Sequence, residues 1–423
     1  MNAPVTPGYS VFRPGPERLR EALDIDKWAF PSPRTAAEAI ADGDERPWDR
    51  VYGLQASDGR LVAFHWSHLF ERFAVPGAFV PTAGLSGVAV HPQHRRRGLL
   101  TAMMGTHLEH CVQRGESLSV LTASEPAIYG RFGYGLASTC VMVSVPHGAA
   151  LRDVPGRDAV TLRVDHAIAE RYLDTAVAVQ RDAAWSAGLV RPGWIQWENR
   201  AVAEAQFRDP PAHRAGAETL RLMVAERDGR PVGFAFFRRT SRWIDGNPRG
   251  TATAGTMAYV DAAAAHAIWS GLANLDLVET TKADFLSPGD ALLGLLVDPR
   301  AATPIAIDGL WVRIVDLPRA LASRQYAAPA DLVLEVTDAR LPSNAGRWRL
   351  RADAFTDGAE VSRTSDAPDV CLDIRELGAV YLGGTALAAL AGAGLVSART
   401  PELLARAATA FAWPVTPALN WDF

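Results

Sequence analysis

The sequence predicts a mixed α/β protein of two or three domains. Its 423 residues are too many for one ordinary hydrophobic core. Hydrophobic residues make up 48% and charged residues 21% of the chain, which is typical of globular and not of disordered proteins. Residues 85–138 contain a strand, a basic turn, a helix and a second strand in that order. A similar order of elements returns between residues 219 and 281.

The rest of the chain is arranged around residues 85–138. Val88 and Val90 alternate with small residues, which is the period of a strand, and Pro92 ends this strand because proline cannot donate to a ladder. Apolar residues then recur at helical spacing over residues 100–112, which predicts an amphipathic helix. The turn between the strand and the helix is therefore the start of a helix.

This turn has the composition of an anion site. Backbone N–H groups at a helix start point outward, and the helix dipole adds about half a positive charge there. Together with three arginines they suit a pyrophosphate, which would be held by Arg95, Arg96, Arg97, Gly98 and Leu99. Neither GxxxxGK[ST] nor GxGxxG is present in this stretch. The alternative is a basic, solvated helix start, which is less favoured because basic residues here oppose the dipole.

Upstream of this segment the sequence predicts one helix and three strands. The helix covers residues 17–30 and ends at Pro31. The strands are expected at residues 50–56, 60–66 and 69–80, the first two joined by a Ser-Asp-Gly turn. With a strand at 117–123, this first domain should finish near Val145, before a loop rich in turn residues.

The same order of elements returns downstream at low sequence identity. Helical patterns are expected at residues 166–190, 194–205, 262–275 and 290–296, and strands at 219–226, 231–239, 253–260 and 277–281. The counterpart of the basic turn, residues 260–266, contains neither arginine nor glycine. If the repeat is real, its anion site is degenerate.

The last part of the chain predicts a third set of elements. Strands are expected at residues 310–318, 332–337, 346–352 and 370–374, and helices at 375–382 and 401–409. Residues 377–398 carry no charge over a length that could span a bilayer. Their alanine and glycine content makes the transfer free energy poor, so a buried strand-to-helix segment is the favoured interpretation.

Two motifs resemble a known family. The run V-A-V-H-P-Q-H-R-R-R-G-L-L resembles the coenzyme A signature [QR]-x-x-G-x-[GA] of the GCN5-related N-acetyltransferases (GNATs), as Arg95-x-x-Gly98-x-Leu100. Leu100 departs from the general pattern, a departure that is usual in the Eis group (enhanced intracellular survival acetyltransferases). The run S-E-P-A-I-Y-G-R-F-G-Y-G also resembles the Eis group.

This resemblance implies tandem GNAT folds followed by a sterol-carrier-protein-like C-terminal domain, in which I-R-E-L-G-A-V-Y-L-G-G is the most similar stretch. The expected domains are residues 1–146, with the acetyl-CoA site; residues 147–298, degenerate; and residues 299–423, which supply the C-terminal carboxylate. A homo-hexamer is implied by the resemblance alone.

The resemblance also implies transfer of an acetyl group from acetyl-CoA, as co-substrate, to a primary amine, without a metal. Alkylamines have pKa values near 10, so a base must accept a proton, and the departing thiolate benefits from an acid. In the Eis group these roles correspond to Tyr129 as the acid and the terminal carboxylate of Phe423 as the base. The exposed strand backbone would orient the acetyl carbonyl, at Val88, Ala89 and Val90. Ser124 would either hydrogen-bond the coenzyme or cap a short helix.

These roles have structural alternatives. Tyr129 could pack a short helix against the sheet, and Phe423 could end a frayed tail. Burial of the tail is favoured because Trp413, Trp421 and Phe423 are aromatic. The substrate pocket is inferred from Asp422 with Asp24 or Asp26, as an acidic site for a polycation such as an aminoglycoside, a polyamine or a lysine side chain. Its walls are expected to include Trp28 and Phe30. Each of these residues has an alternative place on the surface or in the core.

Composition limits the partners. The net charge of −4 and the pI of about 6.2 argue against nucleic acid. The cysteines are far apart and fit no metal spacing. The first 20 residues have no signal-peptide core, so we expect a cytoplasmic protein without a membrane partner. The alternative function is a lipid- or sterol-binding protein with a regulatory acetyl-CoA-binding domain.

Overall fold

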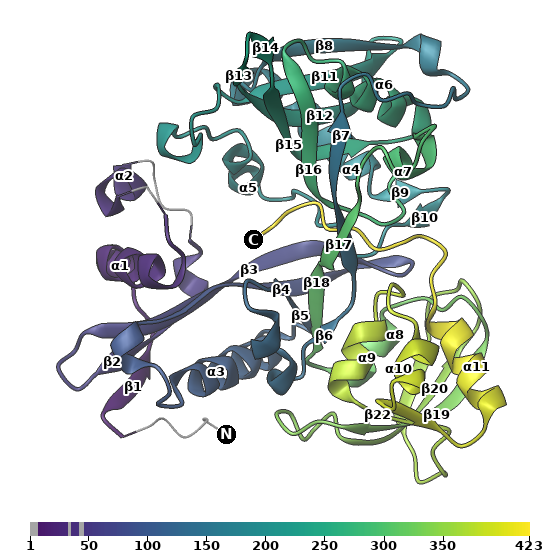
Figure 1. Cartoon of the computed structure of the whole chain (residues 1–423). Coiled ribbons are helices and arrows are strands. Elements are labelled where there is room, and N and C mark those ends of the chain that lie inside the picture. The colour runs from purple at the N-terminus through teal and green to yellow at the C-terminus, as the bar shows by residue number, and fades with distance from the viewer. Residues whose placement is uncertain (1–6, 33–34, 42–45) are drawn as a thin grey trace.

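The computed structural model describes residues 7–32, 35–41 and 46–423, which form three large sheets with helices packed on them and two small hairpins (Figure 1). The N-terminal stretch examined for a signal peptide begins in residues 1–6, outside the described residues. The first two sheets have seven strands each and the third has five. Parallel and antiparallel pairs occur together in each sheet, so the predicted mixed α/β class is confirmed.

The first sheet holds the central segment of the sequence. In spatial order its strands are β1 (Tyr9–Phe12), β2 (Val51–Ala56), β3 (Leu61–Val75), β4 (Ala78–Val90), β5 (Leu118–Thr122), β18 (Leu310–Ile314) and β6 (Gly135–Leu136). Its helices are α1 (Leu19–Ala29), α2 (Ala36–Ala41) and α3 (Leu99–Arg114). Short 3-10 turns lie at Pro16–Arg18, Trp48–Arg50, Pro92–His94, Pro126–Ile128 and Gly130–Phe132. The strand predicted at residues 69–80 is instead the end of β3, a turn and the start of β4.

Glycine sets both ends of α3, the helix that follows the basic turn. Gly98 is its N-cap residue with φ of 78°, and Gly115 is its C-cap with φ of 69°. Both are in the left-handed region, which glycine enters without steric cost. The N–H of Gly115 donates to the carbonyls of Cys111 and Val112, which closes the helix. Of the apolar stripe predicted for this helix, Met103, Met104, Leu108 and Cys111 are buried. Leu100 is partly exposed and Val112 is 52% exposed.

The second sheet repeats this arrangement. In spatial order its strands are β17 (Ile305–Asp308), β7 (Thr139–Pro146), β16 (Val278–Leu286), β15 (Gly250–Tyr259), β12 (Arg230–Thr240), β11 (Arg221–Arg227) and β8 (Val160–His166). The helices are α4 (Ala169–Asp182), α5 (Arg200–Ala205), α6 (Ala262–Ala273) and α7 (Ala291–Leu295), with 3-10 turns at Arg157–Ala159 and Pro211–His213. Two small hairpins are β9 (Trp185–Ser186) with β10 (Leu189–Val190), and β13 (Trp243–Ile244) with β14 (Asn247–Pro248). The helix predicted at residues 194–205 begins only at Arg200, because Ile195 is extended and bridges Phe73 of β3.

The third sheet lies in the C-terminal part. Its strands are β21 (Glu360–Arg363), β20 (Gly346–Ala352), β19 (Ala330–Thr337), β22 (Val370–Asp373) and β23 (Val396–Ala398). The helices are α8 (Leu317–Ala322), α9 (Ile374–Val380), α10 (Leu387–Gly392) and α11 (Pro401–Phe411). The uncharged stretch 377–398 is therefore divided among the end of α9, α10 and β23. Among the described residues, no helix combines the length and apolar character needed to cross a bilayer.

Two segments connect the first and second sheets. The chain leaves the first sheet at β6 and enters the second as β7, and it returns from β17 to the first sheet as β18. β7 pairs with β17, and β6 pairs with β18, both antiparallel. The strand ending near Val145, expected to close the first domain, thus belongs to the second sheet. The strand beginning at Leu310, expected in the third domain, completes the first sheet.

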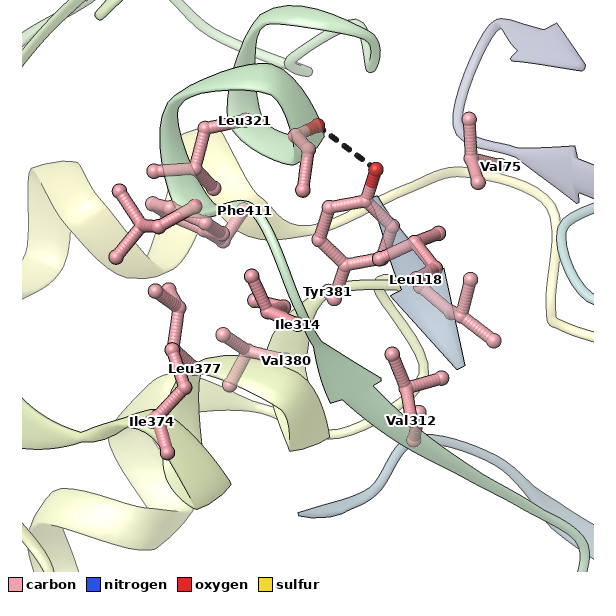
Figure 2. Close-up of a cluster of buried hydrophobic side chains, with 14 of the residues drawn as sticks. Val75, Leu118, Val312, Ile314, Leu321, Ile374, Leu377, Val380, Tyr381 and Phe411 are labelled. Carbon is pink, nitrogen blue, oxygen red and sulfur yellow. Dashed lines mark hydrogen bonds between the residues drawn. The ribbon is translucent and has the colours of Figure 1, made fainter. Parts of the chain in front are cut away.

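The third sheet's helices pack on the first sheet. Figure 2 shows Ile374, Leu377 and Val380 of α9 beside Val312 and Ile314 of β18, and all five are at most 1% exposed. In the same cluster the hydroxyl of Tyr381 donates to the carbonyl oxygen of Ala320 at 2.8 Å. A buried ion pair, Arg313–Asp338 at 2.8 Å, joins β18 to the end of β19. The first and last parts of the chain therefore share one core.

Candidate active site

The site begins where β4 and β5 separate. These parallel strands pair only at Thr82–Leu118, Ala83–Ser119 and Gly84–Val120. Farther along, β4 bulges, because the register against β3 shifts between Phe64 and Trp66. Gly87 in the bulge has φ of 57°, and a Cβ there would lie 1.7 Å from the Trp66 ring. The bulge therefore requires glycine. At the bulge, the backbone of β4 leaves the regular pattern of hydrogen bonds between β3 and β4.

A cavity of about 450 Å³ opens beside this separation. Val88 and Val90 line it, whereas Ala89 between them is 1% exposed and packs on the opposite face of β4. This alternation is the ordinary consequence of a strand. The remaining lining residues are Ala29, Phe30, His94, Arg95, Arg96, Gly98, Leu99, Leu100, Thr101, Ser124, Glu125, Ile128, Tyr129 and Arg131. Of the predicted coenzyme residues, Ala89 and Arg97 are absent from this lining.

Two of the three arginines of the basic turn line the cavity. Arg97 does not, because its guanidinium donates to the hydroxyl of Tyr9 on β1 at 2.7 Å. Arg96 adopts φ of 60°, a conformation that costs a non-glycine residue about 1 kcal/mol or more and that clusters at ligand-binding turns. The first turn of α3 contains no acidic residue. The predicted anion site thus has two arginines, the helix start and its outward amides, together with Arg131.

A second cavity, of about 310 Å³, adjoins the first. The two share Phe30, Val88, Ser124 and Tyr129 in their linings. The other residues of the second cavity are Asp26, Trp66, Leu85, Ser86, Gly87, Thr122, Asp422 and Phe423. A molecule in the cavity beside the basic turn and a molecule in the second cavity would therefore meet beside Tyr129.

The environment of Tyr129 keeps its phenol protonated. Burial, together with a smaller contribution from the nearby carboxylate of Glu125, raises the pKa of Tyr129 to about 12. Its ring is edge-on to the ring of Tyr134, with centroids 6.0 Å apart. Tyr134 is fully buried, and its hydroxyl is hydrogen-bonded to Ser119 at 2.8 Å. The two tyrosines of the motif thus differ: Tyr129 faces both cavities and Tyr134 packs beneath it.

The C-terminal residue lies in the second cavity. The hydroxyl of Thr122, at the end of β5, donates to a terminal carboxylate oxygen of Phe423 at 3.1 Å. The ring of Phe423 packs edge-on against Phe70 at 4.8 Å and lies 5.9 Å from Trp421 between centroids. The last residue is thus packed against the first sheet, and the alternative of a frayed tail does not describe it. The described residues place Tyr129 and the terminal carboxylate around one cavity.

The substrate residues predicted on and next to α1 fall into two groups, those that line the second cavity and those that do not. Asp26 and Phe30 are four residues apart, so they share a helix face, and both line the second cavity. Asp24 and Trp28 lie on other faces of α1; Asp24 is exposed and Trp28 is 61% exposed. Both are absent from the lining, so of these four predicted residues the structure brings only Asp26 and Phe30 to the second cavity. Burial raises the pKa of Asp26 above its ordinary value, with Arg46 opposing this shift.

Sequence reasoning missed Thr122, Trp66, Gly87 and Arg131. A glycine inside a strand pattern is a signal for a bulge, so Gly87 could have been found. Arg131 lies within the tyrosine motif and is basic, which is a weaker signal. Thr122 could not have been found, because its partner is 301 residues away in the sequence.

At the helix start of the second sheet, a carboxylate stands where the first sheet has its basic turn. The side chain of Asp261 caps α6 by accepting the N–H of Ala264 at 2.9 Å. Arg227 donates to both carboxylate oxygens of Asp261, at 2.8 and 2.9 Å. A carboxylate therefore already occupies the position at α6 that corresponds to the basic turn before α3. Within residues 7–32, 35–41 and 46–423, no group of three or more His, Cys, Asp or Glu side chains is arranged to hold a metal ion.

Comparison with known proteins agrees with this geometry. Residues 13–137 and 188–314 each match an acetyltransferase (GNAT) domain, and residues 317–420 match a sterol carrier protein domain. An N-acetyltransferase of Streptomyces avermitilis is 42% identical over 383 residues, covering 89% of this chain and 90% of the relative. The N-acetyltransferase Eis of Mycobacterium bovis is 34% identical, covering 94% and 91%.

A solved structure agrees as well. The crystal structure of Eis1 from Mycobacterium abscessus matches with a TM-score of 0.78 at 29% identity, covering 98% of this chain and 100% of that one. The GNAT domains make the chain an acetyltransferase with acetyl-CoA as its co-substrate. The predicted architecture of two GNAT folds and a sterol-carrier-like domain is confirmed. The chain therefore belongs to the Eis-like group of GCN5-related N-acetyltransferases.

Proposed function

We propose that this enzyme transfers acetyl from acetyl-CoA directly to a primary amine of a polycationic substrate. In this proposal Tyr129 is the general acid and the terminal carboxylate of Phe423 is the general base. The observation that carries it is the meeting of two cavities beside Tyr129, one lined by the basic turn and the other by acidic groups. The first suits the pyrophosphate of the coenzyme, and the second suits an ammonium group.

The proton balance assigns one task to each group. The ammonium first loses one proton to solvent, and the neutral amine nitrogen then forms a bond to the acetyl carbon. The Phe423 carboxylate accepts the second proton, which the nitrogen loses as this bond forms. The bond between the acetyl carbon and sulfur breaks, and the departing sulfur takes the proton of the Tyr129 phenol. At the end of this step the Phe423 carboxyl group has gained a proton and the Tyr129 phenol has lost one. Proton exchange restores both groups before the next turnover.

The carboxylate alone would be a weak base for this task. An α-carboxyl group has a pKa of about 3.5 and an alkylammonium about 10, a gap of roughly 9 kcal/mol at 1.36 kcal/mol per unit. The carboxylate is therefore not expected to deprotonate the ammonium itself. It accepts the second proton, which becomes acidic as the neutral amine forms the new carbon–nitrogen bond. The base must therefore lie at the reaction centre, and the hydrogen bond from Thr122 to Phe423 beside the second cavity supports this placement.

The composition of the second cavity supports a cationic acceptor. The charged groups among its described lining residues are Asp26, Asp422 and the terminal carboxylate. Aromatic faces of Phe30, Trp66 and Phe423 lie around the same space, and such faces attract ammonium groups. A cation beside Asp26 would offset the cost of burying its carboxylate. Aminoglycosides, polyamines and lysine side chains share this chemistry.

We propose one active site per chain. Support comes from Asp261, which caps α6 where a second pyrophosphate would bind and would repel it. Lipid binding by the third domain has less support. The α9 residues that could face a ligand are packed on β18 of the first sheet, as Figure 2 shows.

The test is a panel of acceptors. Release of free CoA thiol from acetyl-CoA is measured with polyamines, aminoglycosides and lysine peptides, and products are identified by mass spectrometry. The matched control replaces each amine by a hydroxyl. We expect thiol release and a mass gain of one acetyl group or more with the amines and neither with the hydroxyl analogues. Absence of both with every amine would refute the proposed acceptor class.

A further inference from the structure

The C-terminal tail is held in place without helix or strand. Residues 412–423 follow α11 and cross the second domain toward the first sheet (Figure 1). Three hydrogen bonds fix the first part of this tail. The indole N–H of Trp413 donates to the carbonyl of Val190 at 3.1 Å, the N–H of Ala418 to Pro192 at 2.9 Å, and the hydroxyl of Ser287 to the carbonyl of Pro417 at 2.9 Å.

Asn420 ties the tail to the first two domains together. Its carbonyl oxygen accepts the N–H of Ile195 at 2.8 Å, and its amide donates to the carbonyl of Ile195 at 2.9 Å. The side chain thus satisfies both backbone groups of Ile195, as a neighbouring strand would. Because Ile195 also bridges Phe73 of β3, the tail is fixed three residues before its end. Three residues can still span roughly 10 Å, so this anchor alone does not place the terminal carboxylate.

Thr122 supplies the missing constraint. It is the last residue of β5, and its neighbour across the sheet is Leu310 of β18, so its backbone is held on a central strand. Its branched side chain restricts the χ1 rotation, which limits where the hydroxyl can point. The hydroxyl donates to Phe423 at 3.1 Å. Thr122 lines the second cavity, and the lining of the coenzyme cavity does not include it.

We infer that Thr122 is a positioning residue for the general base. This inference rests on the proposed function, because it concerns the carboxylate that the proposal makes the base. A donor to a carboxylate oxygen stabilises the ionised form and leaves the other oxygen to face the incoming amine. Thr122 therefore sets both the direction and the protonation state of a group at the end of an otherwise irregular tail.

Two substitutions separate this role from packing. Thr122→Val keeps the branched shape and removes the hydroxyl, and Thr122→Ser keeps the hydroxyl. We expect Thr122→Val to lower kcat at least 10-fold with the KM for acetyl-CoA unchanged, and Thr122→Ser to recover most of kcat. A packing role predicts the reverse order, because serine loses the methyl group.

The second readout does not depend on turnover. In protein labelled with [1-¹³C]phenylalanine, the terminal carboxylate resonance is titrated with pH by NMR. Loss of a donor to the ionised form raises the pKa of the carboxyl, so we expect the midpoint to move up by about 0.5 to 1 unit in Thr122→Val and to stay near that of the unsubstituted enzyme in Thr122→Ser. An unchanged kcat and an unchanged midpoint in Thr122→Val would overturn the inference.

A chain extended by two residues beyond Phe423 distinguishes failure of the proposed mechanism from failure of the role of Thr122 alone. If the extended enzyme turns over normally, the carboxylate is not the base, and the proposed mechanism fails along with this inference. If the extension abolishes turnover while Thr122→Val behaves as the unsubstituted enzyme in both readouts, only the role of Thr122 fails.

Discussion

Gly84 of β4 lies against the ring of Phe423. A Cβ on Gly84 would be 3.1 Å from Cε2 of Phe423 and 2.3 Å from Cε2 of Phe70. The absence of a side chain at this position of the sheet therefore makes the space into which the last residue of the chain fits. A position in the middle of the first sheet thus sets the place of a group contributed by the opposite end of the sequence.

Gly84→Ala should reduce turnover by moving this group. The methyl group displaces the rings of Phe70 and Phe423, and a shift of about 1 Å at a reacting group costs on the order of 10- to 100-fold in rate. Steady-state kinetics should show a fall in kcat, with the affinity for acetyl-CoA retained. Gly255→Ala on β15 is the matched control, because its nearest contact would be an ordinary 3.8 Å. Equal kcat values for the two variants would show that the room beside Phe423 does not matter.

Tyr129→Phe should lower kcat by about 100-fold, because the departing sulfur loses its proton donor while the aromatic packing stays. Tyr134→Phe is the control. It removes the hydrogen bond to Ser119, which costs about 1 kcal/mol of folding free energy, and leaves the cavities intact. Turnover at saturating substrates, with thermal melting of each variant, separates the two effects. A normal kcat in Tyr129→Phe would assign this residue to packing.

Arg96→Ala should weaken acetyl-CoA binding about 10-fold, because a charged donor to the pyrophosphate is lost. The difference should shrink as salt screens the interaction. Isothermal titration with acetyl-CoA measures both effects. Arg97→Ala is the control, since Arg97 is bonded to Tyr9 and lies outside the cavity lining. If Arg97→Ala weakened binding as much as Arg96→Ala, the two arginines would act on the coenzyme in the same way.

His65 should make the fold sensitive to acid. Burial lowers its pKa to about 3 from 6.5, with the charges of His110 and Arg114 adding to the shift. Neither ring nitrogen has a hydrogen-bond partner among the residues that the structure describes. Below pH 6.5 the unfolded state binds a proton that the folded state does not, so stability falls as pH drops from 6.5 toward 3. The loss is about 1.4 kcal/mol per pH unit, or about 2 kcal/mol at pH 5.

His65→Phe removes this titration. Urea unfolding at pH 7, 6 and 5 should therefore give a free energy of unfolding that declines less steeply in the variant than in the unsubstituted enzyme. Parallel declines would mean that His65 does not contribute to acid sensitivity.

The local parts of this fold and site followed from the sequence, and the non-local parts did not. The strand, basic turn and α3 were predictable because Val88, Pro92 and Gly98 act on their immediate neighbours. The sequence could have favoured Asp26 over Asp24 as a residue of the second cavity, because only Asp26 shares a helix face with Phe30. The places of β7 in the second sheet and of β18 in the first could not be predicted, since no local pattern marks pairing between strands so far apart in the sequence.

The role of Phe423 shows the same limit. Its aromatic neighbours in the tail indicated burial, and its proposed part in catalysis came from resemblance. The residues that receive it, Gly84, Phe70 and Thr122, lie on strands whose patterns look ordinary. Their function depends on a tail that arrives from the third domain, which no property of the strands themselves signals.

The central claim is that the terminal carboxylate of Phe423 is the general base. It is tested most directly by adding two residues, Gly-Ser, after Phe423 and measuring both acetyl-CoA affinity and kcat with a polyamine acceptor. The account predicts unchanged affinity for acetyl-CoA, because the coenzyme cavity is not touched, and a loss of kcat of about 100-fold or more. A kcat equal to that of the unextended chain would contradict it.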